Sequence, residues 1–231
     1  DVHKAFGGNL RVIICGGAKL NPALIHTFDS FGITVYEGCG ITECSPLTTL
    51  NPFFAPKPGS IGKPVSSCNL RLDTAGYGKN DKGYREGEIQ VKGSNVMLGY
   101  YKEPQLTKKV LKNGWLCTGD IAILNDHGLI EIKGRQDDLI IRAGMNIYPQ
   151  EIESTLKTDE RVREVLVYKY DSELTGVEIG MKISGDFSSV DEIQKLCNKI
   201  LPTYQMPSHI ELLDELKKNA SGKIIRGVQN D

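Results

Sequence analysis

The first 57 residues combine apolar runs with one amphipathic segment. LRVIICGG is a short β-branched run closed by two glycines, which is typical of a buried strand, and ITVYEG is typical of a second strand. Between them, NPALIHTFDSFG offers Asn21 as a helix cap, Pro22 at the first helical position and Gly32 as the stop. Strand, helix and strand predict the end of a parallel α/β sheet over residues 1–57. Because parallel strands are covered on both faces, we do not expect this part to stand alone.

Residues 58–134 change to short alternating runs separated by glycine turns. The runs CNLRLD, GEIQVKG, DIAILND and LIEIKGR are typical of strands, and NDHG is a hairpin turn between the last two. Together they predict a small antiparallel β barrel or sandwich. Within this part, PQLTKKVLKNGW predicts a short helix that ends at Gly114.

Residues 139–231 predict a C-terminal α+β domain. Its pattern is strand LIIR, loop AGMNIYP, helix PQEIESTLKTD, strands VREVLVYKYD and VEIGMKISG, helix SVDEIQKLCNKIL and strand HIELLDEL. The preceding segment GRQDD is charged, whereas an ordinary linker is rich in Pro, Ser or Gly. Residues 135–138 are therefore either a surface charge run or a charged hinge. Taken together, the three parts predict a mixed α/β and α+β fold for the whole chain.

Composition narrows the classes of partner. The 231 residues carry a net charge of only −1, which argues against nucleic acid or an anionic membrane surface as the main partner. No apolar run approaches the roughly 18 residues of a transmembrane helix, which leaves peripheral membrane association and the oligomeric state open. The six cysteines form no CxxC pair, so free thiols in a reducing cytoplasm are favoured over disulfides or zinc. Because the chain begins DVHKAFGGNL, without a methionine, we expect a piece of a longer protein.

Three short segments carry candidate chemistry, and each has a plainer interpretation. Thr42 and Glu43 in GITE follow a predicted strand, where ligands of open α/β sheets bind. The hydroxyl could contact a phosphate and the carboxylate could hold Mg²⁺, or the segment is a turn with an exposed glutamate. Asp120 in CTGD is either a turn acid, which the segment alone favours, or an acceptor for two vicinal hydroxyls. Gly144 in AGMNIYPQEIE belongs to a strand-to-helix connection or permits close approach of a ligand.

NASGKIIR places Lys223 on a polar strip near the end of the chain, with no hydrophobic face behind it. Gly-Lys occurs in phosphate loops, but Lys217 and Ile224 stand where that motif needs a glycine and a Ser or Thr. Composition alone therefore favours a solvated basic tail.

In combination the segments are far more specific. In this order and spacing, GGAKL, GITE, GSIGKPV, GEIQVKGSNVMLGYY, GWLCTGD, GRQDDLIIRAGMNIYPQEIE and SGKIIR resemble the adenylate-forming superfamily of acyl-CoA synthetases, non-ribosomal adenylation domains and luciferases. The resemblance covers nearly the whole chain. EGCGITECSPLTTLNP and NVMLGYY are most similar to bacterial long-chain fatty acyl-CoA synthetases.

The resemblance implies two reactions and three small-molecule substrates. A carboxylic acid is joined to the α-phosphate of ATP with release of pyrophosphate, and the acyl group then passes to the thiol of coenzyme A. Thr42 is implied to contact phosphate and Glu43 to bind Mg²⁺, which screens the charge of the two anions. Asp120 is implied to accept from both ribose hydroxyls, with Arg135 as a donor at the same sugar. The small residues implied to lie near adenine and the acyl chain are Gly17, Ala18, Gly38, Cys39 and Gly40.

The same resemblance gives the C-terminal domain a moving role. Lys223 is implied to be delivered by this mobile domain, where its ammonium bridges the substrate carboxylate and the α-phosphate. Asp137 matches the hinge about which the domain swings after adenylation. After that motion Gly144 is implied to line the pantetheine channel.

Three departures from the family pattern qualify the expectation. Cys39 stands where an aromatic ring usually stacks on adenine, a contact worth roughly 1 to 3 kcal/mol. Lys217 stands where a proline commonly precedes the last lysine motif. The family's Ser/Thr/Gly-rich phosphate loop lies upstream, so these residues alone are expected to be inactive.

The expected function is that of an AMP-forming acyl-CoA ligase for a medium or long fatty acid. An amino-acid or aryl-acid adenylating domain that loads a carrier protein is one alternative. A catalytically dead nucleotide-binding or scaffolding homologue is another, to which Cys39 lends weight.

Overall fold

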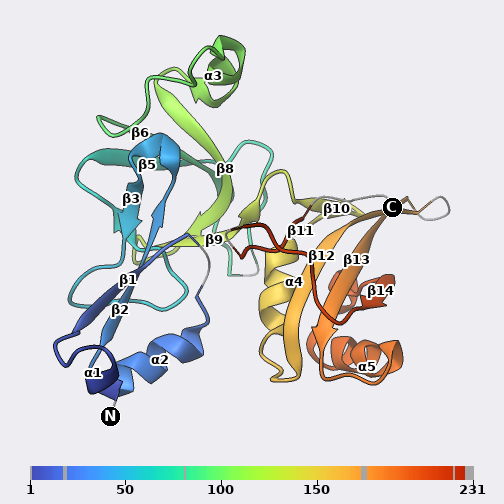
Figure 1. Ribbon diagram of the computed structural model, residues 1–231. Coiled ribbons are helices and arrows are strands. Elements are labelled where there is room, and N and C mark those ends of the chain that lie inside the picture. The colour runs from blue at the N-terminus through green and yellow to red at the C-terminus, as the bar shows by residue number, and fades with distance from the viewer. Residues whose placement is uncertain (1, 18–19, 81, 173–175, 221, 227–231) are drawn as a thin grey trace. The chain divides into compact units, whose positions relative to one another are not determined.

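The computed structural model describes residues 2–17, 20–80, 82–172, 176–220 and 222–226 (Figure 1). The chain divides into two compact units, Asp1–Ile132 and Lys133–Asp231. Each unit combines helices with sheet, and the predicted mixed α/β and α+β fold class is confirmed.

The first unit opens with the predicted strand, helix and strand. β1 and β2 pair in parallel and are joined by α2 (Pro22–Ser30), while β3 and β4 extend the sheet in antiparallel fashion. Asn21 caps α2 as predicted, because its Oδ1 accepts from the Ala23 N–H at 2.9 Å. The strands β1 to β4 are adjacent in numerical order and span Val12–Cys15, Thr34–Gly40, Leu47–Leu50 and Lys63–Pro64. Two short helices complete this part, α1 (Val2–Ala5) and η1 (Thr42–Cys44).

One face of β1 is open to solvent. Val12 and Ile14 keep 44% and 61% of their surface exposed, so the described residues do not bury the strand predicted in LRVIICGG. The β-branched run did indicate strand conformation correctly. Burial, however, depends on which elements pack over the strand, and an apolar run does not indicate which elements those are.

An antiparallel sheet follows in the order β5-β6-β8-β7, with β9 paired to β8. These strands span Cys68–Asp73, Glu86–Gly93, Leu111–Lys112 (β7), Trp115–Leu124 (β8) and Ile130–Arg135 (β9). The sheet curls into a half barrel (Figure 1). Its buried side chains include Ile89, Val91 and Leu116. NDHG forms the predicted turn, with the Gly128 N–H donating to the Asn125 carbonyl at 2.9 Å.

The helix within this sheet is shorter than predicted. α3 spans Pro104–Val110, so it ends four positions before Gly114. Asn113 (φ 52°) and Gly114 (φ 77°) instead form the two-residue turn of the β7–β8 hairpin, in which Lys112 pairs with Trp115. Asn-Gly is a strong hairpin signal because both residues tolerate positive φ, and that signal prevailed over helix continuation.

The second unit is the predicted α+β domain. β12 and β13 pair antiparallel, β14 adds in parallel to β13, and a single core of Ile, Leu, Val and Met side chains joins this sheet to α4 and α5 (Figure 1). The main elements are α4 (Pro149–Leu156), β12 (Val162–Ser172), β13 (Gly176–Gly185), α5 (Val190–Ile200), η2 (Thr203–Gln205) and β14 (His209–Leu212). AGMNIYP is not wholly a loop: Ala143 and Gly144 form the turn of a small hairpin between β10 (Ile140–Arg142) and β11 (Met145–Ile147).

The strip that carries Lys223 is an anchored hairpin, here called the Lys223 hairpin, described over residues 217–220 and 222–225. The Ile225 N–H donates to the Lys217 carbonyl at 3.0 Å, and the Asn219 N–H donates to the Lys223 carbonyl at 2.9 Å. Glu164 of β12 fixes one end, because its carboxylate accepts from the Leu216 N–H at 3.0 Å and pairs with the Lys218 ammonium. Backbone hydrogen bonds and an ion pair therefore hold the described part of this strip.

Gly62 allows a close crossing of two backbone segments, and replacing it should destabilise the first unit. A Cβ at Gly62 (φ 81°) would lie 2.0 Å from the Leu50 carbonyl oxygen. We expect Gly62→Ala to lower the free energy of unfolding by about 2 to 4 kcal/mol, from positive φ and steric overlap together. Gly59→Ala (φ 82°), where no heavy atom lies within 4 Å, is the matched control. Urea unfolding of the complete protein measures both, and equal losses would contradict the steric explanation.

Acid should weaken the anchor at Glu164. The hydrogen bonds from Lys218 and the Leu216 N–H lower the pKa of this carboxyl below its ordinary value of 4.5. A group with a lowered folded-state pKa stabilises the fold above its unfolded pKa, and this contribution is lost as pH falls through the folded pKa. Between about pH 5 and pH 3, the melting temperature should therefore fall more steeply in the wild type than in Glu164→Gln. Glu160→Gln, at an exposed position on the preceding turn, should behave like the wild type. If the melting temperature falls equally with pH in all three proteins, Glu164 does not anchor the hairpin.

Candidate functional site

The predicted phosphate-contacting hydroxyl and metal-binding carboxylate lie directly after β2. Thr42 and Glu43 occupy the single turn η1, which Ser45 closes in the left-handed conformation (φ 59°). This is the carboxyl end of a strand in a parallel pair, where α/β folds bind ligands. The plainer interpretation, a turn with an exposed glutamate, is half right: the turn exists, but Glu43 is half-buried.

Tyr100 holds the Glu43 carboxylate in place. The phenol donates to Glu43 Oε1 at 2.7 Å, and the Met97 N–H donates to the Glu43 carbonyl at 2.8 Å. The hydrogen bond to Glu43 and burial both raise the pKa of Tyr100, so the phenol stays a proton donor at neutral pH. Sequence reasoning assigned Tyr100 no role although it stands in NVMLGYY, because a contact across 57 residues leaves no periodic signal.

Asn95, in the segment before Tyr100, contacts the last residue of η1 and the first residue of β3. Asn95 Nδ2 donates to the carbonyls of Cys44 and Leu47, at 3.1 and 3.2 Å. The Tyr100 N–H in turn donates to Thr107 Oγ1 of α3 at 2.9 Å. These bonds hold η1, and with it the carboxylate of Glu43, in a defined position. A single carboxylate of this kind suits Mg²⁺, which keeps several waters and shares its remaining positions with phosphate oxygens.

Cys39 and Asp120, predicted to face adenine and ribose, lie near one another. Burial raises the pKa of the Cys39 thiol, and the negative charge of Asp120 raises it further. The backbone of Cys39 is held by β3, since Thr48 Oγ1 donates to its carbonyl at 2.9 Å and its N–H donates to Thr49 Oγ1 at 3.2 Å. The thiol is therefore neutral at physiological pH, and it presents a small apolar surface beside a carboxylate.

Asp120 lies inside β8, so the interpretation as a turn acid is wrong. Thr118 orients this stretch, because its hydroxyl donates to the Ile89 carbonyl at 2.9 Å and accepts from the Asp120 N–H at 3.1 Å. Gly119 has φ 72°, and its N–H donates to Glu88 Oε1 at 2.9 Å where the β6–β8 register shifts. Such irregularities re-aim side chains next to functional sites.

The predicted small residues divide into two kinds. A Cβ at Gly38 would lie 2.7 Å from the Thr49 carbonyl oxygen, and one at Gly40 would lie 2.9 Å from the Pro46 carbonyl oxygen. These two glycines are required by the close packing of β2 on the next strand, whatever the ligand. A Cβ at Gly17 (φ 86°) would meet no heavy atom of the described residues within 4 Å. Ala18 lies outside the described residues.

The second unit carries the remaining predicted residues. Arg135 ends β9, and the exposed Asp137 lies in a turn closed by the Asp138 N–H donating to the Arg135 carbonyl at 3.3 Å. Gly144 (φ 78°) lies in the β10–β11 turn and faces no heavy atom within 4 Å. Lys223 is exposed, and its N–H donates to Asn219 Oδ1 at 2.9 Å.

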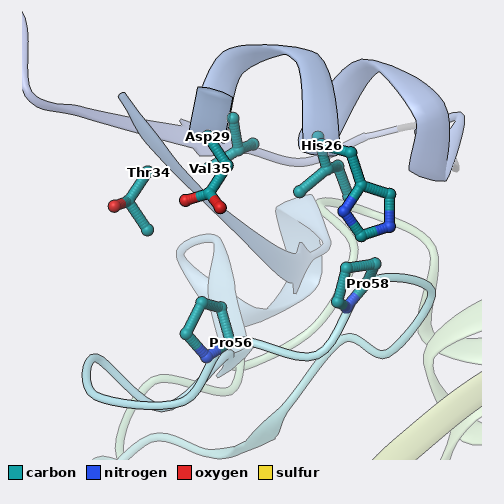
Figure 2. Close-up of a pocket in the computed structure, with 7 residues that line it drawn as sticks. His26, Asp29, Thr34, Val35, Pro56 and Pro58 are labelled. Carbon is teal, nitrogen blue, oxygen red and sulfur yellow. The ribbon is translucent and has the colours of Figure 1, made fainter. Parts of the chain in front are cut away.

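A cavity of ≈ 150 Å³ lies elsewhere in the first unit, between α2 and the segment that holds Pro56 and Pro58. Figure 2 shows His26 and Asp29 on its rim beside these prolines and Thr34. None of the predicted site residues lines this cavity. The carboxylate of Asp29 would repel a phosphate, so the cavity is no match for a nucleotide.

The described ranges contain neither a cluster of metal ligands nor a membrane-spanning helix. In that part of the chain, no three His, Cys, Asp or Glu side chains gather as a metal site would require. No helix there is both long enough and apolar enough to cross a membrane.

Comparison with known proteins agrees with the fold. The family described as AMP-binding enzyme matches residues 1–101, and the AMP-binding enzyme C-terminal domain matches residues 151–223. A long-chain-fatty-acid–CoA ligase of Yersinia pestis is 37% identical over 94% of this chain and 39% of its own length. A 2-succinylbenzoate–CoA ligase of Geobacillus is 36% identical over 97% of this chain and 46% of its own length. The chain thus spans less than half the length of these relatives.

Solved structures give the same result. The o-succinylbenzoate CoA synthetase of Bacillus subtilis, bound to its acyl-adenylate intermediate, superimposes with a TM-score of 0.84 at 32% identity. The match covers 96% of this chain and 46% of that enzyme. The same enzyme bound to ATP and magnesium ion gives a TM-score of 0.84 at 33% identity. The chain belongs to the adenylate-forming, AMP-binding enzyme superfamily.

Proposed function

We propose that this chain is part of an AMP-forming CoA ligase acting on an acyl or aryl carboxylic acid. The main support for this proposal is the similarity to two CoA ligases over more than nine-tenths of the chain. The geometry supports it, because Glu43 is held by Tyr100 at a strand end and Cys39 lies near Asp120 in the same unit. Six cysteines without CxxC pairs suit a cytoplasmic location.

In the first reaction the acid's carboxylate oxygen attacks the α-phosphorus of ATP, and pyrophosphate leaves. When bound, Mg²⁺ would screen the negative charge on the phosphates, and Glu43 is the residue proposed to hold it. Thr42 is proposed to donate its hydroxyl to phosphate. Asp120 is proposed to accept from the ribose hydroxyls, with Arg135 donating to the same sugar. Lys223 is proposed to lie between the two reacting anions, where its ammonium offsets their repulsion.

In the second reaction the thiolate of coenzyme A attacks the acyl carbon, and AMP leaves. Asp137 is the proposed hinge for the movement between the two reactions, in a segment that is a short hydrogen-bonded turn. Gly144 is proposed to line the path of the pantetheine arm, because its open surface leaves room for close approach.

The substrate is proposed to be a medium or long fatty acid. NVMLGYY and EGCGITECSPLTTLNP support this choice, as does the Yersinia pestis relative. An aryl acid is the second candidate, because relatives of nearly equal identity act, by their names, on 2-succinylbenzoate. Pyrophosphate release with a panel of both acid types separates the two. Offering CoA and a holo carrier protein in turn identifies the acceptor, and no release with any acid would favour the nucleotide-binding scaffold instead.

Lys223→Ala should abolish most adenylation in the complete protein. Removing one cation from between two anions should slow pyrophosphate release by about 10²-fold or more. Lys195→Ala, at an exposed position on α5, is the matched control and should leave the rate unchanged. If Lys223→Ala releases pyrophosphate as fast as the wild type from every acid, Lys223 is not the adenylation group.

Tyr100→Phe should weaken the proposed metal site without removing its ligand. Loss of the 2.7 Å hydrogen bond frees the Glu43 carboxylate, and loss of such an outer contact lowers metal affinity by about tenfold or more. The Mg²⁺ concentration for half-maximal pyrophosphate release should therefore rise. Tyr101→Phe changes a neighbouring ring that is 86% exposed and should have no effect. Identical Mg²⁺ curves for all three proteins would show that Tyr100 does not support the metal ligand.

A further inference from the structure

Arg226, which follows the Lys223 hairpin directly, contacts three separate parts of the second unit. Its Nη2 lies 2.6 Å from Glu153 Oε2 of α4, and its Nη1 donates to the Val167 carbonyl of β12 at 3.4 Å. Its Nε lies 3.6 Å from Asp138 Oδ2, in the proposed hinge segment 135–138. One side chain thus joins the hairpin to a helix, a strand and the hinge segment.

Glu153 makes this contact more than a surface ion pair. The residue is buried, with 8% of its surface exposed, and its Oε1 accepts from the Val167 N–H at 2.9 Å. A buried carboxylate is costly unless a cation and hydrogen bonds compensate it. Arg226 supplies this cation at Glu153 Oε2. The ion pair therefore holds the end of the Lys223 hairpin next to Glu153.

The geometry of the pair suits arginine and no other side chain. A guanidinium presents its N–H groups in a rigid plane, so it can point at a carboxylate, a carbonyl and a second carboxylate at once. A lysine ammonium carries the same charge but cannot span these three acceptors from one position. Charge alone would therefore restore only part of the contact.

The opposite strand of the hairpin is held independently by Glu164, through Lys218 and the Leu216 N–H. Glu164 and Glu153 thus hold the two sides of the hairpin at its open end. Lys223 lies three positions before Arg226 on the same strand, so its backbone position follows from these grips.

We propose that Arg226 is a positioning residue for Lys223. Its pairing with Glu153 fixes the hairpin on the domain, and its contact with Asp138 ties the hairpin to the hinge segment. This inference rests on the proposed role of Lys223 in adenylation. Arg226 itself touches no reacting group in this account, and acts by holding the backbone from which Lys223 extends.

The test compares Arg226→Gln and Arg226→Lys with wild type in the complete protein. Misplacing a catalytic group by about 1 Å can cost about 10²-fold, so Arg226→Gln should lower kcat for pyrophosphate release by about that factor. KM for ATP and for the acid should stay unchanged, and Arg226→Lys should recover only part of the rate. Arg163→Gln, which breaks an exposed 3.7 Å pair with Asp186 in the same unit, should leave kcat unchanged.

Two readouts separate positioning from general damage. Transfer of the acyl group from supplied acyl-adenylate to CoA should keep its wild-type rate in Arg226→Gln, because that reaction is not assigned to Lys223. Amide hydrogen exchange at Lys223 and Ile225 should speed up, while β12 and β13 stay protected. Should Arg226→Gln fail to fold, Glu153→Gln keeps an oxygen for the Val167 N–H but loses the charge, and should give the same pattern.

The outcomes divide cleanly. If Lys223→Ala stops pyrophosphate release while Arg226→Gln changes neither kcat nor hairpin exchange, positioning is overturned and the proposed function stands. If both half-reactions fall equally, Arg226 is a stability residue and the inference is overturned. If Lys223→Ala has no effect, the proposed role of Lys223 falls and the catalytic inference falls with it, while the exchange rates show whether Arg226 holds the hairpin.

Discussion

A carboxylate taken out of water needs a hydrogen-bond donor or a cation, and this requirement ties together the segments on which the proposed function depends. Glu43 takes a proton donor from Tyr100, 57 positions away, and Glu153 takes a cation from Arg226, 73 positions away. Glu164 similarly holds the chain near Leu216. Each contact fixes the place of a residue proposed to handle phosphate or its charge.

The two units meet this requirement with different consequences. In the first unit, the bond to Tyr100 orients the Glu43 carboxylate in advance, so the proposed binding of a cation there would need little rearrangement. In the second unit, the carboxylates anchor a hairpin rather than a ligand. Lys223 is therefore carried on a fixed part of its own domain, and a change in its position is expected to involve the domain as a body. The simplest interpretation of NASGKIIR is a loose polar strip that flexes. The backbone hydrogen bonds of this segment do not agree with that interpretation.

Close backbone packing explains three glycines of the family motifs, two of which the resemblance places near adenine and the acyl chain. Gly38, Gly40 and Gly62 each lie so close to a neighbouring carbonyl that a methyl group would overlap it. Gly17 and Gly144 instead face open space. Both kinds stand in motifs typical of the family, so a motif by itself does not tell whether a glycine serves the fold or the ligand.

Local patterns determined much of the fold. The cap at Asn21, the turn at NDHG and the alternation in CNLRLD were predictable because they depend on a few neighbouring residues. Where two local signals competed, as at the Asn113-Gly114 turn after α3, the turn chemistry prevailed over the helix pattern. The order of the motifs likewise sufficed to identify the family.

The pairing of Tyr100 with Glu43, the nearness of Cys39 to Asp120 and the grip of Glu153 on Arg226 were decided only by the tertiary structure. The physical reason is the same in each case. Contacts between residues far apart along the chain depend on how whole elements pack, and no periodicity or spacing in the sequence records which side chains then meet.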